Sequence, residues 1–178
     1  MTADKILQRT AMAARLMAAA GPARKASALR LAAARIRGQA EELETAARLD
    51  DRRFSADTAA ALADGILKLA DKPDPVGSVL SGGRRTDGQT VSAVRVPLGA
   101  VGVLDGGDPA AVIRFAALLT AGGNTALFGA EPQRNRAASL AVELFRRALL
   151  EAGLPADGVA GVPRAELIGD NEIFLEHY

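Results

Sequence analysis

Three short apolar runs, separated by two longer helical stretches, constrain the fold of this chain more than any other feature. The runs lie at 100–104, 125–129 and 158–162, and the stretches between them, 109–121 and 133–152, repeat apolar residues at helical spacing. Strand, helix, strand, helix and strand in this order predict a parallel sheet with right-handed crossovers. Because three strands make only half of a doubly wound domain, the sequence predicts an α/β fold with a truncated, Rossmann-like sheet.

A helical arm is predicted before this α/β unit. Residues 3–20 are expected to form one helix, and a second begins at Pro22 and carries one apolar stripe until Asp50 interrupts it. A third helix is predicted over 57–70. The segment that follows, 71–77, holds two prolines and a glycine, which is typical of a connector between layers.

The sequence pattern changes again after the connector. Asp87 and Gly88, flanked by β-prone residues such as Val91 and Val94, are a good hairpin signal and predict two antiparallel strands on an exposed ribbon. The chain is therefore expected to have three parts: an N-terminal helical arm (1–77), a β-hairpin (78–97) and an α/β unit (98–178).

Composition excludes several kinds of site. The chain contains no cysteine and a single histidine, His177, so no disulfide, thiolate metal site, cysteine nucleophile or Ser-His-Asp triad is expected. A net charge of +1 gives no reason to expect nucleic acid as a partner. No apolar run is long enough to predict a membrane span, and the start lacks a secretory signal, so cytoplasm is the expected compartment.

The core and the distribution of charge both suggest association. Aromatic residues are only 3% of the chain, so the core must be built from small aliphatic side chains that each bury little area, and homo-oligomerisation is expected. Residues 1–53 carry a net charge of +5 and residues 151–178 a net charge of −5. These charges are either solvated helix faces or an acidic tail that contacts the basic arm, in the same chain or in a second copy.

A series of motifs occurs in a fixed order along most of the chain: KPDPVG at 72–77, the hairpin, RVPLGAVGVL at 95–104, Pro109, AGGN at 121–124 and AGLPADGV at 152–159. In this combination the chain resembles the glutamyl-5-phosphate reductase branch of the aldehyde dehydrogenase superfamily, over about residues 5–163. The resemblance implies an NADPH-binding α/β domain whose parallel sheet begins at Val101, as in aldehyde dehydrogenase cofactor domains. It also implies an oligomerisation ribbon at about 78–96.

The chemistry that the resemblance implies needs a group that this chain does not have. The family reduces glutamyl phosphate to the semialdehyde in proline synthesis, through a thioester on a cysteine thiolate and a hydride from NADPH. That cysteine belongs to a second domain, downstream of the matched stretch. With no cysteine, the chain cannot form this thioester by itself.

Several positions depart from the family pattern. Where the family has Arg-Pro-Asn after the first strand, residues 108–110 read Asp-Pro-Ala, so a cation and a side-chain oxyanion donor are both replaced. Ala121 stands where the family has a lysine, and Gly129 where it has an arginine. Glu131 adds a carboxylate that would repel a cofactor phosphate. The scaffold is retained and the chemistry is lost, which is typical of a repurposed or degenerate relative.

Two carboxylates, Asp105 and Asp108, follow the first parallel strand, where α/β proteins place ligands. They could perform acid-base chemistry or bind a cation, or they could simply form the turn around Gly-Gly. For Asn124 the structural alternative is a helix-to-strand turn with left-handed backbone angles, and for the glycines it is tight strand-to-helix turns. The resemblance places cofactor contacts at six residues: Gly106, Gly107, Pro109, Ala110, Asn124 and Gly129.

Three functional hypotheses follow. In the first, the chain is a non-catalytic derivative of the reductase cofactor domain that binds a ligand or a partner, as a homo-oligomer through the 78–97 hairpin. No cofactor is then expected, and NADP(H) enters only by resemblance. In the second, it is an enzyme with non-cysteine chemistry, with Asp105, Asp108 and Asn124 lining its site. In the third, it is one half of a split NADP-dependent glutamate-5-semialdehyde dehydrogenase, whose partner supplies the cysteine domain and the missing strands.

Overall fold

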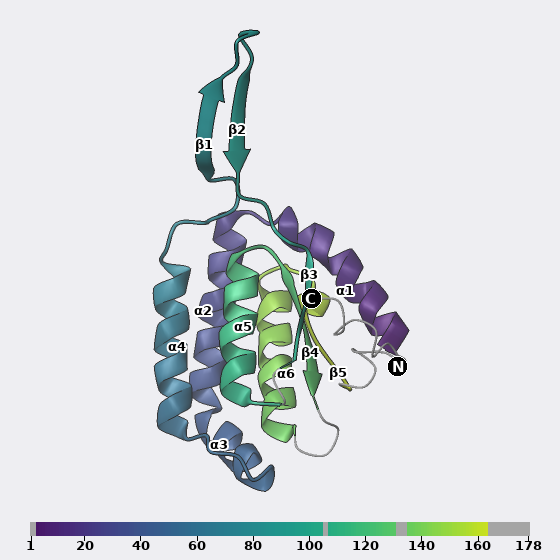
Figure 1. The fold of residues 1–178 in the computed structure, drawn as a ribbon. Helices are drawn as coiled ribbons and strands as arrows, with labels where there is room; N and C mark the ends of the chain where they lie inside the picture. The colour runs from purple at the N-terminus through teal and green to yellow at the C-terminus, as the bar shows by residue number, and fades with distance from the viewer. Residues whose placement is uncertain (1–2, 105–106, 131–134, 164–178) are drawn as a thin grey trace.

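The computed structural model describes residues 3–104, 107–130 and 135–163. Within these ranges no helix combines the length and the apolar character that crossing a membrane requires. Figure 1 shows helices packed around a small sheet, with a ribbon projecting from one end. The elements follow in this order: α1 (Ala3–Ala18), α2 (Pro22–Gly38), α3 (Ala40–Leu49), α4 (Ala56–Ala70), β1 (Val79–Arg84), β2 (Thr90–Val94), β3 (Ala100–Val103), α5 (Pro109–Ala121), β4 (Thr125–Ala130), α6 (Arg136–Glu151), the short 3-10 helix η1 (Ala156–Gly158) and β5 (Val159–Pro163).

The parallel sheet is confirmed. Its strands lie in the order β3-β4-β5, with Val101 beside Ala126 and Leu127 beside Ala160. Helices α5 and α6 return the chain to the start of the next strand, so the carboxyl ends of the three strands lie at one edge, which we call the carboxyl edge. The opposite edge, where the strands begin, lies at the base of the ribbon (Figure 1).

Alternate residues of β4 and β5 face two separate apolar clusters, as the two-residue period of a strand requires. On one face they join the main core between the sheet and the helices: Ala126, Phe128 and Val159. On the other face a small cluster lies against Ile6 of α1: Leu127, Ala160 and Val162. The sheet is therefore covered on both faces, by α5 and α6 on one side and by α1 on the other (Figure 1).

The main core is rich in alanine, as the composition predicts. Its largest fully buried side chains include Met17, Phe128 and Phe145, and buried alanines of α2, α3 and α4 belong to the same cluster. One apolar cluster runs through both the helical arm and the α/β unit. The division of the chain into three parts remains a prediction.

The prediction of one continuous helix from Pro22 to Asp50 was wrong. Helix α2 ends at Gly38, Gln39 takes a φ of −120°, and α3 then begins in a new direction (Figure 1). The apolar stripe continues across the break, because Ile36 and Leu43 are both fully buried. A glycine destabilises a helix interior, so Gly38 permits a break that the stripe alone does not reveal.

The predicted hairpin is confirmed. Strands β1 and β2 pair antiparallel, with Val79 beside Val94, and every residue of both strands is exposed. In the turn, Gly88 has a φ of +86° and donates a hydrogen bond to the Arg85 carbonyl at 2.9 Å. A register shift between Val79 and Ser81 makes β1 less regular than β2. We call these two strands and their turn the ribbon.

Candidate functional site

The carboxyl edge, the expected ligand site of a parallel sheet, is built around the start of α5. Among the predicted site residues, Asp105 and Gly106 lie outside the described residues, as does Glu131. Gly107 is buried and has a φ of +82°, in the left-handed region that favours glycine. Pro109 occupies the first turn of α5, where its missing N–H leaves no hydrogen bond unmade.

Asp108 caps helix α5. Its Oδ1 atom accepts a hydrogen bond from the Ala110 N–H at 3.0 Å, and its main-chain carbonyl accepts from Val112 at 3.0 Å. The carboxylate is thereby held against the positive end of the helix dipole. A helix N-terminus of this kind otherwise attracts a phosphate group, so in this chain the position is taken by a negative charge of the protein itself.

Asp50 plays the same part at the start of α6. It follows α3, is 1% exposed, and accepts a hydrogen bond from the Ala137 N–H at 3.1 Å. Its other oxygen lies 3.6 Å from Arg136, which also donates to the Leu49 carbonyl at 3.0 Å. No sequence pattern indicates this contact, because Asp50 and Ala137 are 87 residues apart.

The two capped helix N-termini show whether the described residues fit the dinucleotide that the resemblance implies. A pyrophosphate needs backbone N–H donors or cations. At this edge, first-turn donors of α5 and α6 bond to Asp108 and Asp50, and the Arg136 guanidinium lies beside Asp50. The described part of the carboxyl edge therefore does not fit a pyrophosphate at either helix. In the described ranges no group of three acidic or histidine side chains could hold a metal ion either.

The structure does not bring Asn124 to the same site as Asp108. Helix α5 separates them, and its 13 residues span about 20 Å. Asn124 Oδ1 accepts from the Gly99 N–H at 3.0 Å, and its Nδ2 donates to the Gly122 carbonyl at 3.2 Å, which joins the turns that enter β3 and β4. The left-handed angle expected for Asn124 was wrong, because Gly123 takes it, with a φ of +70°.

The remaining predicted contact, Gly129, is a buried residue of β4 next to its last residue. It lies near the carboxyl edge with Asp108, so the structure brings together Gly107, Asp108, Pro109, Ala110 and Gly129. Ala110 is half-buried in the first turn of α5. In its described part, the edge thus holds small and apolar groups, the engaged carboxylates of Asp108 and Asp50, and the Arg136 guanidinium beside Asp50.

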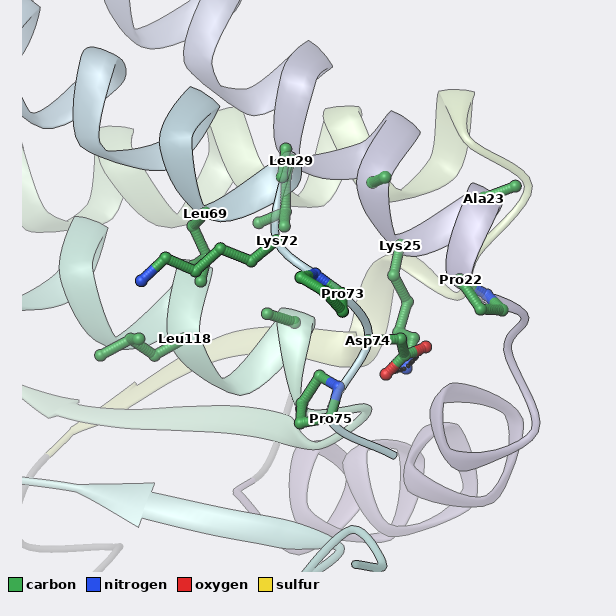
Figure 2. A pocket seen from close by; sticks show the side chains of 14 residues that line it. Pro22, Ala23, Lys25, Leu29, Leu69, Lys72, Pro73, Asp74, Pro75 and Leu118 are labelled. Carbon is green, nitrogen blue, oxygen red and sulfur yellow. Dashed lines mark hydrogen bonds and ion pairs between the residues drawn. The ribbon is translucent and has the colours of Figure 1, made fainter. Parts of the chain in front are cut away.

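A cavity of about 500 Å³ lies away from the carboxyl edge (Figure 2). It is formed by the start of α2, the ends of α4 and α5, and the connector that follows α4. Its walls are mainly apolar and include Leu29, Leu69 and Leu118. Lys25 in its wall is 3% exposed, and its Nζ lies 2.6 Å from one oxygen of Asp74 and 2.8 Å from the other. This ion pair, which was not predicted from the sequence, links α2 to the connector that leads into the ribbon.

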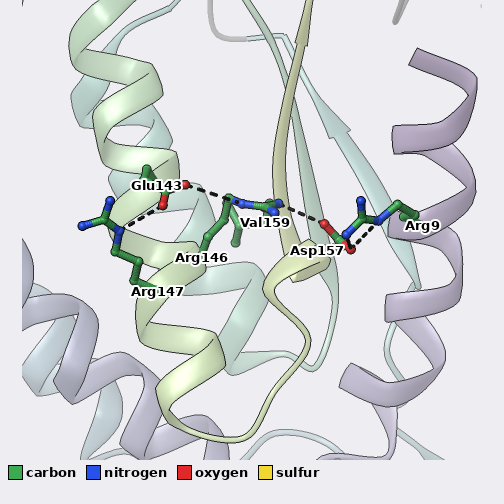
Figure 3. A network of polar contacts seen from close by, with 6 residues as sticks. All are labelled: Arg9, Glu143, Arg146, Arg147, Asp157 and Val159. Atoms are coloured by element: carbon green, nitrogen blue, oxygen red, sulfur yellow. Dashed lines mark hydrogen bonds and ion pairs between the residues drawn. The ribbon is translucent and has the colours of Figure 1, made fainter. Parts of the chain in front are cut away.

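Asp157 links two arginines from different helices (Figure 3). Its Oδ2 lies 2.8 Å from Arg9 of α1, and its Oδ1 accepts from Arg146 of α6 at 3.1 Å. A further ion pair joins Arg35 to Glu151. These contacts join Glu151 and Asp157 to the basic arm within one copy. The rest of the predicted acidic tail, 164–178, lies outside the described residues.

Comparisons of the sequence and of the fold with known proteins indicate what the chain is similar to. No family model matches the chain. Over 156 residues it is 36% identical to a gamma-glutamyl phosphate reductase of Methylocella silvestris, an alignment that covers 88% of this chain. The chain is a relative of the gamma-glutamyl phosphate reductases. It spans 35% of the length of this relative and 40% of that of a Methylobacterium radiotolerans reductase, to which it is 33% identical.

Solved structures confirm the fold of this reductase relative. The gamma-glutamyl phosphate reductase of Thermotoga maritima superposes with a TM-score of 0.83 at 20% identity, over 92% of this chain and 44% of that one. A probable aldehyde dehydrogenase of Listeria monocytogenes gives 0.72 at 19% identity, over 92% and 37%. The architecture is thus that of the aldehyde dehydrogenase-like cofactor domains.

Proposed function

We propose that this reductase relative is non-catalytic and acts by binding a partner, in the first place a second copy of itself, through the ribbon. The observation that carries the proposal is the cap on α5. Asp108 holds a carboxylate 3.0 Å from the Ala110 N–H, where an anionic ligand would otherwise bind. A second negative charge at this position would be repelled and would displace an existing hydrogen bond.

The catalytic groups that the family reaction needs give a second reason for the same proposal. Thioester formation needs a thiolate, and the chain contains no cysteine. Asp108 is engaged by α5, which leaves it poorly placed to act as a base on a ligand. Partner binding requires neither group.

The ribbon supplies the surface for a partner. All residues of β1 and β2 are exposed, and they include large apolar side chains, among them Val79, Leu80, Val91 and Val94. An isolated two-stranded hairpin is marginally stable in water and gains stability when a third strand or an apolar face covers it. A ribbon that stands away from its own body (Figure 1) is therefore suited to contact another molecule.

A titration with NADPH tests the non-catalytic part of the proposal. The fluorescence of NADPH is followed as the purified chain is added, and NADP-dependent turnover of glutamate semialdehyde is measured in parallel. We expect neither saturable binding nor turnover. The variant Asp108→Gly removes the carboxylate and keeps a residue suited to a helix N-cap, and we expect it to bind inorganic phosphate or NADPH more tightly than the parent chain. Saturable NADPH binding by the parent chain would refute the proposal.

A second candidate is the split dehydrogenase, and the 36% identity to the Methylocella silvestris reductase favours it. In this candidate a second polypeptide supplies the part of the reductase that the alignment does not cover. Co-expression with a separately encoded cysteine domain from such a reductase, followed by a turnover assay, distinguishes the two. Restored NADP-dependent turnover would support the split enzyme and contradict the non-catalytic proposal.

A further inference from the structure

A second cavity adjoins the one that holds the pair of Lys25 and Asp74. It has a volume of about 370 Å³ and follows the groove between α4 and α5. Leu69, Lys72 and Leu118 line both cavities and form the rim between them. The volume of each cavity lies in the range of small-molecule sites in proteins, about 300–1,000 Å³.

Apolar side chains form most of the walls of both cavities. Leu29 and Leu69 belong to the larger cavity, and Leu62 and Ile66 belong to the groove. Leu118 on the shared rim is 56% exposed, although it is a large apolar residue. A concave apolar surface of this kind is suited to cover the apolar part of a ligand.

The groove between α4 and α5 is also basic. The described residues that line it include Lys68, Lys72 and Arg114 and no acidic residue. Among the described residues, none forms an ion pair with these three side chains. Figure 2 shows the ammonium group of Lys72 directed away from Asp74. The groove therefore presents positive charge that the described part of the chain does not neutralise.

The acidic residues that neighbour these lysines in the sequence are paired with α2 instead. Asp64 pairs with Arg37, and Asp71 lies 2.7 Å from Arg30. Helix α4 thus directs its carboxylates towards α2 and leaves its two lysines at the groove. The positive charge of the groove follows from this division.

We propose that the two cavities bind a medium-chain aliphatic carboxylate, with its chain in the larger cavity and its carboxylate in the groove beside Lys68 and Lys72. The ammonium of Lys25 is bound by both oxygens of Asp74, so the wall of the larger cavity holds a pair without net charge. The charge that attracts an anion therefore lies in the groove. This site shares no residue with the ribbon or with the groups described at the carboxyl edge, so the inference goes beyond the proposed function.

Calorimetric titration of the full chain tests the chemistry of the ligand. Octanoate is titrated beside octanol, which has the chain without the charge, and beside butyrate, which has the charge with a much shorter chain. We expect saturable binding of octanoate, about tenfold weaker binding of octanol, and no saturable binding of butyrate. Octanoate should also raise the melting temperature, as a ligand of the folded state does.

A lysine variant tests where the carboxylate binds. Lys68→Gln combined with Lys72→Gln removes two charges and keeps most of each side chain. It should weaken octanoate binding about tenfold and leave octanol binding unchanged. Three of the four lysines of the chain line the two cavities, so the fourth, Lys5 of α1, provides the control. Lys5→Gln should change neither affinity.

A cavity-filling variant tests where the chain binds. Ala26 lines the larger cavity and is half-buried, and Ala26→Phe places an aromatic ring in the space. It should weaken both octanoate and octanol by more than about tenfold, because each loses the apolar surface that it would cover. If Ala26→Phe does not fold, as judged by circular dichroism, Leu118→Ser at the exposed rim replaces it and should weaken both ligands about threefold.

The outcomes that would overturn the inference are specific. Equal affinity for octanoate and octanol, or octanoate binding unchanged by the lysine variant, would remove the charged part of the site. Octanoate binding unchanged by Ala26→Phe, or by Leu118→Ser in its place, would remove the cavity. Absence of octanoate binding, together with weaker self-association of the lysine variant in sedimentation velocity, would assign the groove to a second copy. Saturable NADPH binding would refute the proposed function and leave this inference standing, so the two can fail separately.

Discussion

The two edges of the parallel sheet are covered to very different degrees. In β5, Val159 is fully buried and Ala160 and Val162 are nearly so, and the Val159 carbonyl accepts a hydrogen bond from Arg146 at 3.1 Å. In β3 the residues alternate between exposed and half-buried. Apart from Pro163 at the end of β5, both strands consist of alanine, valine and glycine, so composition hardly separates them. What differs is the set of side chains that other elements bring to each edge.

The largest effect should come from a charge placed in β5. Val159→Asp buries a carboxylate without a partner, which should lower the free energy of unfolding by about 3–5 kcal/mol. Val101→Asp places the same group in half-buried β3 and should cost about 1–2 kcal/mol, because water still reaches it. Urea denaturation of both variants measures the difference. Equal losses of unfolding free energy in the two variants would show that the two edges are equally covered, contrary to the difference described above.

A smaller effect should come from the arginine that covers β5. Arg146→Met keeps an aliphatic side chain but loses the hydrogen bonds to Asp157 and to the Val159 carbonyl, both 3.1 Å. We expect a loss of about 1.5 kcal/mol in the free energy of unfolding.

The neighbouring Arg147 is the matched control, because it is more exposed and pairs with Glu143 on the same helix at 2.9 Å (Figure 3). Arg147→Met should cost less than about 0.5 kcal/mol, as exposed ion pairs generally do. A loss for Arg147→Met as large as that for Arg146→Met would mean that surface charge, and not coverage of β5, determines the effect.

The cap that follows β3 should contribute about as much as an ordinary helix cap. Asp108→Ala removes the acceptor for the Ala110 N–H and should lower the free energy of unfolding by about 1 kcal/mol, whereas Asp108→Asn keeps an acceptor and should lower it by less. Thermal unfolding at low and high salt measures both. If Asp108→Ala is as stable as the parent chain, the carboxylate is not held by α5, and the argument against an anion site there fails.

Much of the fold could be predicted because it depends on local patterns. The runs around Val101 and Phe128 are too short and too apolar for surface helices, and the helical stretches between them fix a parallel order. The hairpin was predicted from Asp87 and Gly88 for the same reason. The break at Gly38 was missed, because the apolar stripe continues through it and a single glycine does not determine where a helix ends.

The candidate site could be predicted only in part, because its character depends on contacts distant in sequence. The position of Asp108 after a strand indicated the carboxyl edge, but its hydrogen bond to Ala110 appears only once α5 is built. Asp50 looked like a helix terminator, and nothing in the sequence places it 3.1 Å from the N–H of Ala137. The pair of Lys25 and Asp74, 49 residues apart, was missed for the same reason.

The smallest effect on the free energy of unfolding should arise at Glu44, which lies away from both edges of the parallel sheet. It shows how stability depends on pH at a site that does not belong to either edge. Hydrogen bonds from the Arg48 side chain and from the Ala56 N–H, at 2.9 Å, lower the pKa of Glu44 below its ordinary value of 4.5. A carboxyl group with a lowered pKa in the folded state adds stability above its unfolded pKa, and this stability is lost as the pH falls through the folded value. The parent chain should therefore lose more stability than Glu44→Gln between about pH 6 and about pH 3. The difference between their unfolding free energies, measured in urea across this range, should shrink as the solution is acidified. A difference that stays constant with pH would mean that the charge of Glu44 does not contribute to stability.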